Sequence, residues 1–402
     1  MQCASATLEP RDEADAVDAI RAANAKASSY AIAGGGSKSR LGRFAPQAQS
    51  LSTAALTGVT LYEPEELVLS ARAGARLSEI EALLDEHGQQ LAFEPLDYGL
   101  LLGAEQGGAT IGGVVAVNAS GPRRIKAGAA RDHVLGFRCV TGRGEPVKSG
   151  GRVMKNVTGY DLSKLVCGSY GTLALLTEVT LKVLPKPETE CTLLAIGGDE
   201  TESLALLRRA TATPCEPSSL AMLPVGAALS LRANAAAIRL EGPAISVTAR
   251  RDDLVARLAG GGIRFETLDE KDSRALWRNL RDAAPLAAMA GQVWRISVAP
   301  TEGFAVVERI RRAGTPALAH FYDWAGGLIW LCVETAPDAH AAMVRGAVDA
   351  GHATLIRASE ATRAVVDVFH PQPAALAALT RRVKESFDPA QILERGRMRA
   401  EF

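Results

Sequence analysis

The stretch of small residues at 107–121, GGATIGGVVAVNASG, constrains this chain more than any other part of its sequence. Five of its fifteen residues are glycine, which is far above ordinary usage. Side chains this small allow a backbone to lie flat against an extended ligand. They equally allow two segments of the protein interior to approach each other closely. The sequence alone leaves both interpretations open.

A second glycine cluster, Gly34-Gly35-Gly36, directly follows a short apolar strand expected at 30–33. Successive glycines let the chain turn sharply and leave backbone N–H groups free to bind an anion such as a phosphate or pyrophosphate. Ser37 and Ser39 add hydroxyl donors, and a plain glycine turn is the competing interpretation. The cluster has no G-K-[ST], and Ser39 stands where a dinucleotide fingerprint has its last glycine. It therefore belongs to neither common phosphate-binding motif.

The hydrophobic pattern divides the chain into two domains. Helical spacing is expected at 12–26, 77–87 and 376–387, and a long strand at 172–183. Pro185 and Pro187 then end the strand pattern, because two prolines in three residues do not continue a central strand. After them, strands at 192–196, 293–298, 315–321 and 327–333 alternate with helices at 201–211, 303–313 and 338–350. The prediction is an α+β fold with domains at 1–187 and 188–402.

Charge and cysteine usage argue against several classes of partner. Lys plus Arg and Asp plus Glu are both 45, so the chain lacks the basic excess typical of nucleic-acid-binding proteins. The sequence has no apolar run of about 18 residues, and its first residues lack the pattern of a signal peptide. The six cysteines are never spaced C-x-x-C, which argues against zinc or an iron–sulfur cluster in this chain. These features favour a cytoplasmic protein with reduced thiols and no metal site.

Five sequence blocks in a fixed order carry a resemblance to a known family. They are AGGGSKSRLG (33–42), GATIGGVVAVNASGPRR (108–124), GAARDHVLG (128–136), VMKNVTGYDLSKLVCGSYGTLALLTEVTLKVLP (153–185) and FDPAQILERGRM (387–398). The first domain resembles the FAD-binding domain of the p-cresol methylhydroxylase (PCMH) and vanillyl-alcohol oxidase (VAO) superfamily. The whole chain resembles, more closely, the FAD-binding E subunits of bacterial glycolate oxidase (glycolate dehydrogenase).

The resemblance implies a two-subdomain PCMH/VAO-type FAD-binding domain followed by an α+β, FAD-linked oxidase-like C-terminal domain. It implies that the pyrophosphate of FAD lies on the loop after the first strand and that the adenine end lies near residues 176–177. Carried over residue by residue, the cofactor-binding set is Ala33, Gly34, Gly35, Gly36, Ser37, Lys38, Thr110, Gly112, Gly113, Asn118, Ala119, Ser120, Gly121, Leu176 and Thr177.

Two departures from the superfamily refine this expectation. Several members tether the flavin through a histidine just after the glycine loop, where this chain has Ser37, so the FAD is expected to be non-covalent. The hydroxyacid-oxidising members carry a histidine cluster and a G-D-G-N motif, and this sequence has neither. Its six histidines also lack metal-ligand spacing. No catalytic residue and no metal ligand is assigned.

The resemblance implies an FAD-binding redox subunit of a multi-subunit glycolate dehydrogenase or oxidase. Such a complex oxidises glycolate to glyoxylate with a larger partner FAD subunit and an iron–sulfur subunit, and membrane association through these partners is left open. One alternative is a self-sufficient FAD-dependent oxidoreductase acting on another alcohol or hydroxyacid, and another is a non-catalytic assembly subunit.

Oxidation of a 2-hydroxyacid by this chain alone would require a cation that holds the substrate carboxylate. The candidates are Arg123, Arg124, Lys126 and Arg131, because guanidinium and ammonium groups bind carboxylates. A solvated basic loop is the other interpretation of the same residues.

Overall fold

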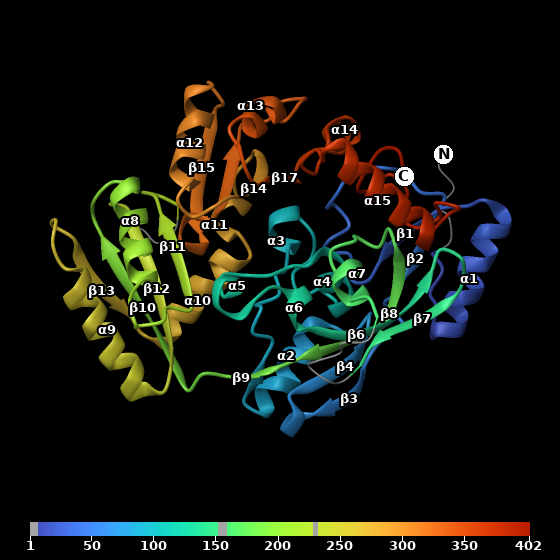
Figure 1. The fold of residues 1–402 in the computed structure, drawn as a ribbon, viewed down its shortest axis with the longest axis horizontal. Coiled ribbons are helices and arrows are strands. Elements are labelled where there is room, and N and C mark those ends of the chain that lie inside the picture. Colours follow the sequence, from blue (N-terminus) through green and yellow to red (C-terminus); the bar gives the residue numbers. More distant parts are fainter. Residues whose placement is uncertain (1–6, 152–158, 228–231) are drawn as a thin grey trace. The chain divides into compact units, whose positions relative to one another are not determined.

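The computed structural model describes residues 7–151, 159–227 and 232–402 (Figure 1), so residues 153–158 of the fourth resemblance block lie outside the described residues. The chain forms two compact units. Unit 1 comprises 1–120, 128–186 and 371–402, and unit 2 comprises 121–127 and 187–370. The units separate after Lys186, next to the prolines that suggested a boundary. The segments 121–127 and 371–402 group differently from the expected domains 1–187 and 188–402, and the second does so because its residues bond to the first strand.

Unit 1 is built on a five-stranded antiparallel sheet in the order β3-β4-β8-β6-β7. Its strands are β3 (Val59–Glu63), β4 (Val68–Arg72), β6 (Val134–Thr141), β7 (Pro146–Gly150) and β8 (Ala174–Lys182). The long strand expected at 172–183 is the central strand β8. Leu175 and Leu176 point to opposite faces of it, and both are buried. Both faces of this sheet are therefore covered at β8, where the alternating pattern predicts one apolar inner face.

β1 (Tyr30–Ala33) and β2 (Gln49–Ser52) form a small parallel sheet in unit 1. The helix α1 (Glu13–Lys26) begins after Asp12, whose side chain accepts a hydrogen bond from the Asp15 N–H, and it packs Ile20 against Tyr30. Figure 1 draws the C-terminal helix α15 (Ala374–Phe387) in red. The segment after α15 forms a parallel bridge between Leu393 and Tyr30. The C-terminal segment is thus part of the fold around β1.

Further elements of unit 1 are short. They are η1 (Pro64–Glu66), α2 (Leu77–Glu86), β5 (Gln89–Gln90), α3 (Gly99–Leu102), α4 (Ile111–Val117), α6 (Ala130–His133), α7 (Leu162–Val166) and β9 (Leu184–Pro185). The helix expected at 77–87 is α2, and Gly88 follows it with a φ of +63°. Asp161 caps α7 by accepting a hydrogen bond from the Lys164 N–H at 3.2 Å.

Unit 2 is built on an eight-stranded antiparallel sheet in the order β13-β10-β12-β11-β15-β16-β14-β17. Its strands are β10 (Thr189–Ile196), β11 (Ser219–Leu223), β12 (Ala235–Gly242), β13 (Arg264–Leu268), β14 (Gln292–Ser297), β15 (Ala317–Asp323), β16 (Leu328–Val333) and β17 (His352–Arg357). Its helices are α5 (Arg124–Ala127), α8 (Glu200–Thr211), α9 (Ala244–Leu258), α10 (Glu270–Arg281), α11 (Ala284–Ala287), α12 (Gly303–Arg312), η2 (Trp324–Gly326), α13 (Ala341–Gly346) and α14 (Glu360–Val365).

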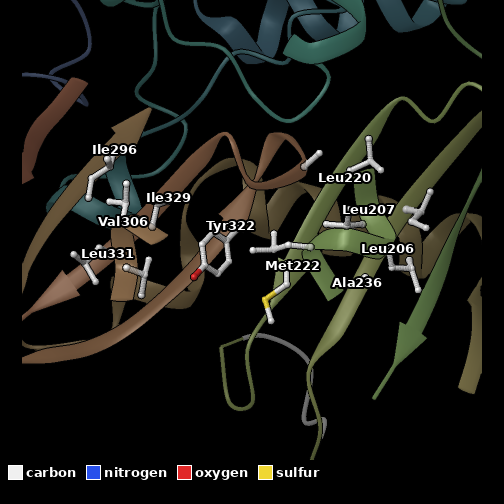
Figure 2. Close-up of a cluster of buried hydrophobic side chains, with 14 of the residues drawn as sticks. Leu206, Leu207, Leu220, Met222, Ala236, Ile296, Val306, Tyr322, Ile329 and Leu331 are labelled. Carbon is white, nitrogen blue, oxygen red and sulfur yellow. The ribbon is translucent and has the colours of Figure 1, made fainter. Parts of the chain in front are cut away.

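One face of this sheet carries the apolar core of unit 2 (Figure 2). Met222, Tyr322 and Ile329 come from three strands that are neighbours in the sheet, and Leu207 of α8 and Val306 of α12 belong to the same buried cluster. Because side chains alternate along a strand, the residues between them point to the opposite face. The core therefore uses only half of the side chains of each strand.

The opposite face of the sheet holds a buried charge network, which consists of Arg123, Glu190, Arg239 and Glu241. The Nε of Arg123 donates to both carboxylate oxygens of Glu241, at 3.0 and 2.9 Å, and Arg239 lies 3.9 Å from the same carboxylate. Arg239 is 2% exposed and lies over the ring of Trp277. Burial opposes ionisation of Glu241, but Arg239 and Arg123 lower its pKa to about 2. These four side chains neutralise one another inside unit 2.

Candidate functional site

A cavity in unit 1 lies where the glycine loop after β1, the start of α4, the loop 169–171 and β8 meet. Counting the open space at its mouth, the cavity holds about 730 Å³ that no protein atom fills. Ten of the fifteen predicted cofactor-binding residues line it: Ala33, Gly34, Gly35, Gly36, Ser37, Lys38, Thr110, Gly112, Gly113 and Leu176. Residues far apart in the sequence are thus brought to one cavity.

The three glycines of the loop are required for two different reasons. A Cβ on Gly34 would overlap the side chain of Thr110, and a Cβ on Gly35 would overlap the carbonyl oxygen of Gly108. Gly36 has a φ of +79°, which side chains rarely adopt, and a Cβ there would meet nothing within 4 Å. Gly34 and Gly35 therefore allow close packing on the segment 108–110, whereas Gly36 allows the turn.

The same loop presents a row of backbone donors. Among the described residues, the N–H groups of Gly34, Gly35, Gly36 and Ser37 have no hydrogen-bond acceptor. Ser37 and Lys38 are both buried, and the Lys38 Nζ lies 3.2 Å from the Ser37 Oγ. Amide N–H groups, a hydroxyl and an ammonium are the groups that bind phosphate oxygens in proteins. The chemistry of this donor set fits the diphosphate of a dinucleotide.

Residues 111–117 of the small-residue stretch form the helix α4, and Gly112 and Gly113 in its first turn line the cavity. Thr110 caps α4 by accepting a 3.4 Å hydrogen bond from the Gly113 N–H. A Cβ on Gly112 would lie 2.7 Å from atoms of Ala73, and a Cβ on Gly113 would lie 3.7 Å from the Lys38 Cδ. The glycines therefore let the first turn of α4 pack against Ala73 on one side and Lys38 on the other. Close packing thus accounts for Gly112, and contact with a ligand stays a prediction for the part of this stretch that lines the cavity.

Five predicted residues do not line the cavity: Asn118, Ala119, Ser120, Gly121 and Thr177. The Asn118 side chain accepts from the Arg131 N–H at 3.1 Å, and the Ser120 hydroxyl accepts from the Ala130 N–H at 2.8 Å, while Ala119 is buried between them. Thr177 donates to Glu13, and Gly121 lies in unit 2, where its carbonyl accepts from the Trp324 Nε1–H at 3.3 Å. These contacts are hydrogen bonds within the protein, so they stabilise the chain outside the cavity.

Two residues of the C-terminal segment, Glu394 and Arg397, line the cavity although the predicted set contains neither. The Glu394 carboxylate accepts from the Ile32 N–H at 2.8 Å. The Arg397 guanidinium donates to the carbonyls of Lys38 at 2.9 Å and Leu41 at 3.2 Å, and to Glu394 at 2.7 Å. Glu394 therefore binds the strand before the glycine loop, and Arg397 binds the carbonyls after it. The block FDPAQILERGRM was the signal that could have included both residues.

A buried ion pair holds the same segment in place. The Lys384 Nζ donates to Asp388 at 2.6 Å, to the Leu393 carbonyl at 3.0 Å and to the Thr172 carbonyl at 2.7 Å. Asp388 in turn accepts from the Leu393 N–H at 2.9 Å. Burial lowers the pKa of Lys384, while Asp388 acts in the opposite direction. Lys384 thereby connects the C-terminal segment to the loop 169–171 of the cavity.

The four candidate cations for a substrate carboxylate occur mostly in ion pairs. Arg123 is held by Glu241, Lys126 lies 2.9 Å from Glu216, and Arg131 lies 3.8 Å from Asp132. Arg124 lies over the ring of Trp324, with 4.9 Å between its Cζ and the ring centroid. Each of the four cations on this basic loop therefore already contacts a carboxylate or an aromatic ring of the protein.

The described cysteines are buried thiols. Cys139, Cys167, Cys191, Cys215 and Cys332 are free and buried, and burial raises the pKa of Cys139 and Cys167 to about 12. Within the described ranges, no group of three or more His, Cys, Asp or Glu side chains is arranged to hold a metal ion. In the same part of the chain, no helix has both the length and the apolar character needed to cross a membrane.

Comparisons with known proteins support this description. Residues 4–150 match the family model described as "FAD binding domain". The chain is 36% identical to glycolate oxidase subunit GlcE of Escherichia coli (strain K12) over 376 residues, which cover 92% of this chain and 93% of that protein. It is 47% identical to glycolate oxidase subunit GlcD of Bacillus subtilis (strain 168) over 87 residues, or 22% of this chain and 18% of that protein.

A solved structure is similar over nearly the whole fold. p-Cresol methylhydroxylase with substrate bound superposes with a TM-score of 0.71 at 14% identity, covering 98% of this chain and 88% of that chain. The fold expected from the resemblance is confirmed by this similarity.

Proposed function

The chain belongs to the family of the glycolate oxidase subunit GlcE, and from this premise we propose that it is an FAD-binding redox subunit of a complex that oxidises glycolate or a related 2-hydroxyacid. The observation that carries this proposal is the cavity of unit 1. Four backbone N–H groups without acceptors among the described residues, a buried hydroxyl and a buried ammonium lie there on one loop.

In the proposed binding mode, the loop from Gly34 to Lys38 holds the diphosphate of FAD. The first turn of α4 and the residues around Leu176 give the cavity its other walls. The bound flavin supplies a ring that accepts two electrons from a substrate and passes them on. The residues of this chain bind and orient the dinucleotide, and Lys38 offsets the negative charge that the diphosphate brings.

We expect the FAD to be held without a covalent bond. Ser37 occupies the place of the tethering histidine, and no histidine is among the residues that line the described cavity. A serine hydroxyl donates a hydrogen bond to a phosphate oxygen but does not form the histidyl–flavin bond. Acid precipitation of the yellow protein is therefore expected to release all of its flavin. Flavin that remains with the precipitate contradicts this part of the proposal.

The division of labour within the complex is also a proposal. The similar proteins are named as subunits, which supports an assembly with a larger FAD subunit. The cysteines of this sequence lack cluster spacing, so we assign the iron–sulfur centre to another chain, which passes electrons onward. A cytoplasmic location fits the reduced cysteines. Oxidation of glycolate to glyoxylate then takes place with these partners.

The flavin site is tested by measuring FAD affinity from the change in flavin fluorescence. Lys38→Met is expected to weaken FAD binding at least tenfold, because a charge-assisted hydrogen bond contributes about 1.5–3 kcal/mol. Lys26→Met, on the exposed end of α1, is the matched control. Equal affinities for wild type and Lys38→Met would remove the site assignment.

The assembly is tested by co-purification from the native host, with mass spectrometry of the bound proteins and a glycolate-dependent dye-reduction assay. We expect two further subunits and activity of the complex. Full activity of the isolated chain would instead identify a self-sufficient oxidoreductase, and a chain that never takes up FAD would identify an assembly protein.

A further inference from the structure

Arg295 lies on β14 and points away from the apolar core of unit 2. Its neighbours in the sequence, Trp294 and Ile296, both belong to that core, so alternation along the strand places Arg295 on the opposite face. Its Cζ lies 5.0 Å from the ring centroid of Trp324 and 6.0 Å from that of Trp330. The two indoles contact the guanidinium and fix its position.

The guanidinium of Arg295 has no acceptor within the part of the chain that the structure describes. Among the described residues, no hydrogen bond and no carboxylate partner is found for it, and the residue is only partly exposed. Stacking on tryptophan satisfies the faces of a guanidinium and leaves its five N–H donors in the plane. Because the residue is partly exposed, donors that the protein leaves unused are accessible to an anion from solution.

Two further groups lie beside it. Arg124 stacks on the same Trp324 ring at 4.9 Å, so the two guanidinium carbons are at most about 10 Å apart. Thr354 of β17 is the cross-strand partner of Arg295 in the sheet register, which places both side chains on one face. The described residues offer no hydrogen-bond partner to the Thr354 hydroxyl. The neighbourhood therefore combines positive charge with an available hydroxyl.

The tryptophan between the two guanidiniums is held in an unusual backbone conformation. Trp324 and Ala325 have φ values of +53° and +56°, in the left-handed region that costs energy for residues other than glycine. The Trp324 N–H donates to Asp323 at 2.7 Å, and its Nε1–H donates to the Gly121 carbonyl. These bonds hold the indole in the position that orients Arg295.

We propose that Arg295 and Thr354 form a binding site for a small monocarboxylate on unit 2, with Arg124 adding positive charge. The guanidinium binds the two carboxylate oxygens side by side, and the Thr354 hydroxyl adds a third hydrogen bond. The choice of a 2-hydroxyacid as ligand rests on the proposed function, whereas the anion site itself rests on the geometry of unit 2.

The test uses the full FAD-loaded chain and the fluorescence of its tryptophans, two of which contact Arg295. Glycolate is expected to change the signal in a saturable manner, and glycolamide, which lacks the charge, is not. Arg295→Gln is expected to raise the Kd for glycolate at least tenfold, and Thr354→Val a few fold. Arg264→Gln, an exposed residue of β13 paired with Glu266, is the matched control and is expected to bind as wild type does.

Absence of saturable glycolate binding to the wild type, or an unchanged Kd in Arg295→Gln, overturns the proposal. If Arg295→Gln does not fold, Arg295→Lys and Thr354→Val decide the question by the same criterion. FAD affinity is measured in every variant and is expected to stay unchanged. A failure of the anion site is thereby distinguished from a failure of the flavin site in unit 1.

Discussion

The two units of the molecule offer positive charge in different ways. In unit 1, the loop from Gly34 to Ser37 presents backbone N–H groups, so it requires glycine, and the single side chain of Lys38 adds a charge beside them. In unit 2, arginine side chains provide the charge, and Arg123 and Arg239 are matched by buried glutamates. A site made from the backbone is visible in the sequence as glycine. A site made from side chains becomes visible only when the partners of each charge are known.

The largest effect is expected from breaking the buried charge network of unit 2. Glu241→Gln removes the charge of the carboxylate nearest to Arg123, and removing one partner of a buried pair costs about 3–5 kcal/mol of unfolding free energy. Urea unfolding followed by tryptophan fluorescence measures it, since all four tryptophans lie in unit 2. The control is Glu266→Gln at the exposed edge strand β13, for which a change below about 1 kcal/mol is expected. Equal losses of unfolding free energy in the two variants would show that the buried network stabilises unit 2 no more than an exposed ion pair does.

A smaller effect is expected from adding one methyl group to the backbone-built site of unit 1. The Cβ of Gly35→Ala overlaps the Gly108 carbonyl, so the loop moves away from α4, at a cost of about 1–3 kcal/mol. FAD binding, measured by fluorescence, is expected to be lost. Gly151→Ala, where a Cβ would meet nothing within 4 Å, is the control in the same unit. Normal FAD binding by Gly35→Ala would mean that the loop position is unimportant.

Removing the hydrogen bonds that Arg397 donates beside the glycine loop is expected to lower FAD affinity more than folding stability. Arg397→Met deletes the donors to the carbonyls of Lys38 and Leu41, and we expect FAD to bind about tenfold more weakly, equivalent to about 1.4 kcal/mol. Stopped-flow measurement of flavin release separates this from a loss of folded protein. The exposed Arg395 provides the control variant Arg395→Met. An unchanged release rate in Arg397→Met would limit Arg397 to a structural role.

The smallest effect concerns pH. Burial alone would raise the pKa of Glu200, but hydrogen bonds and charge from His320, Arg311 and Tyr322 lower it to about 2. A depressed carboxylate pKa stabilises the folded state above the ordinary value near 4.5 and loses that contribution as the pH falls toward 2. Glu200→Gln is therefore expected to destabilise unit 2 at pH 7 and to differ less from wild type at pH 3. A constant difference between the two pH values would contradict this account.

Local patterns predicted much of the fold. The strand 30–33 and the helix α2 follow from short-range hydrophobic spacing, and the glycines at 34–36 indicated the loop that lines the cavity. The pattern missed β12, whose Ala235, Ala236 and Ala237 have little strand preference and are ordered by their neighbours in the sheet.

The candidate site was predicted less completely than the fold, because some of its contacts join distant parts of the sequence. Glu394 reaches Ile32 across 362 positions, and no local spacing indicates such a pair. Arg295 lies in an ordinary strand pattern, and that no described residue accepts from its guanidinium is a property of three-dimensional packing. Asn118 and Ser120 directly follow α4, a helix that lines the cavity. Their side chains nevertheless accept hydrogen bonds from the backbone of residues 130–131, away from the cavity.

The bond between Ile32 and Glu394 has a consequence for biosynthesis. At ribosomal speeds of about 5–20 residues per second, translation of Glu394 follows that of Ile32 by roughly 20–70 s. During that interval the nascent glycine loop lacks the hydrogen bonds that Glu394 and Arg397 make beside it. If FAD binds at the proposed site, we therefore expect it to be loaded late, after Glu394 and Arg397 have reached the glycine loop.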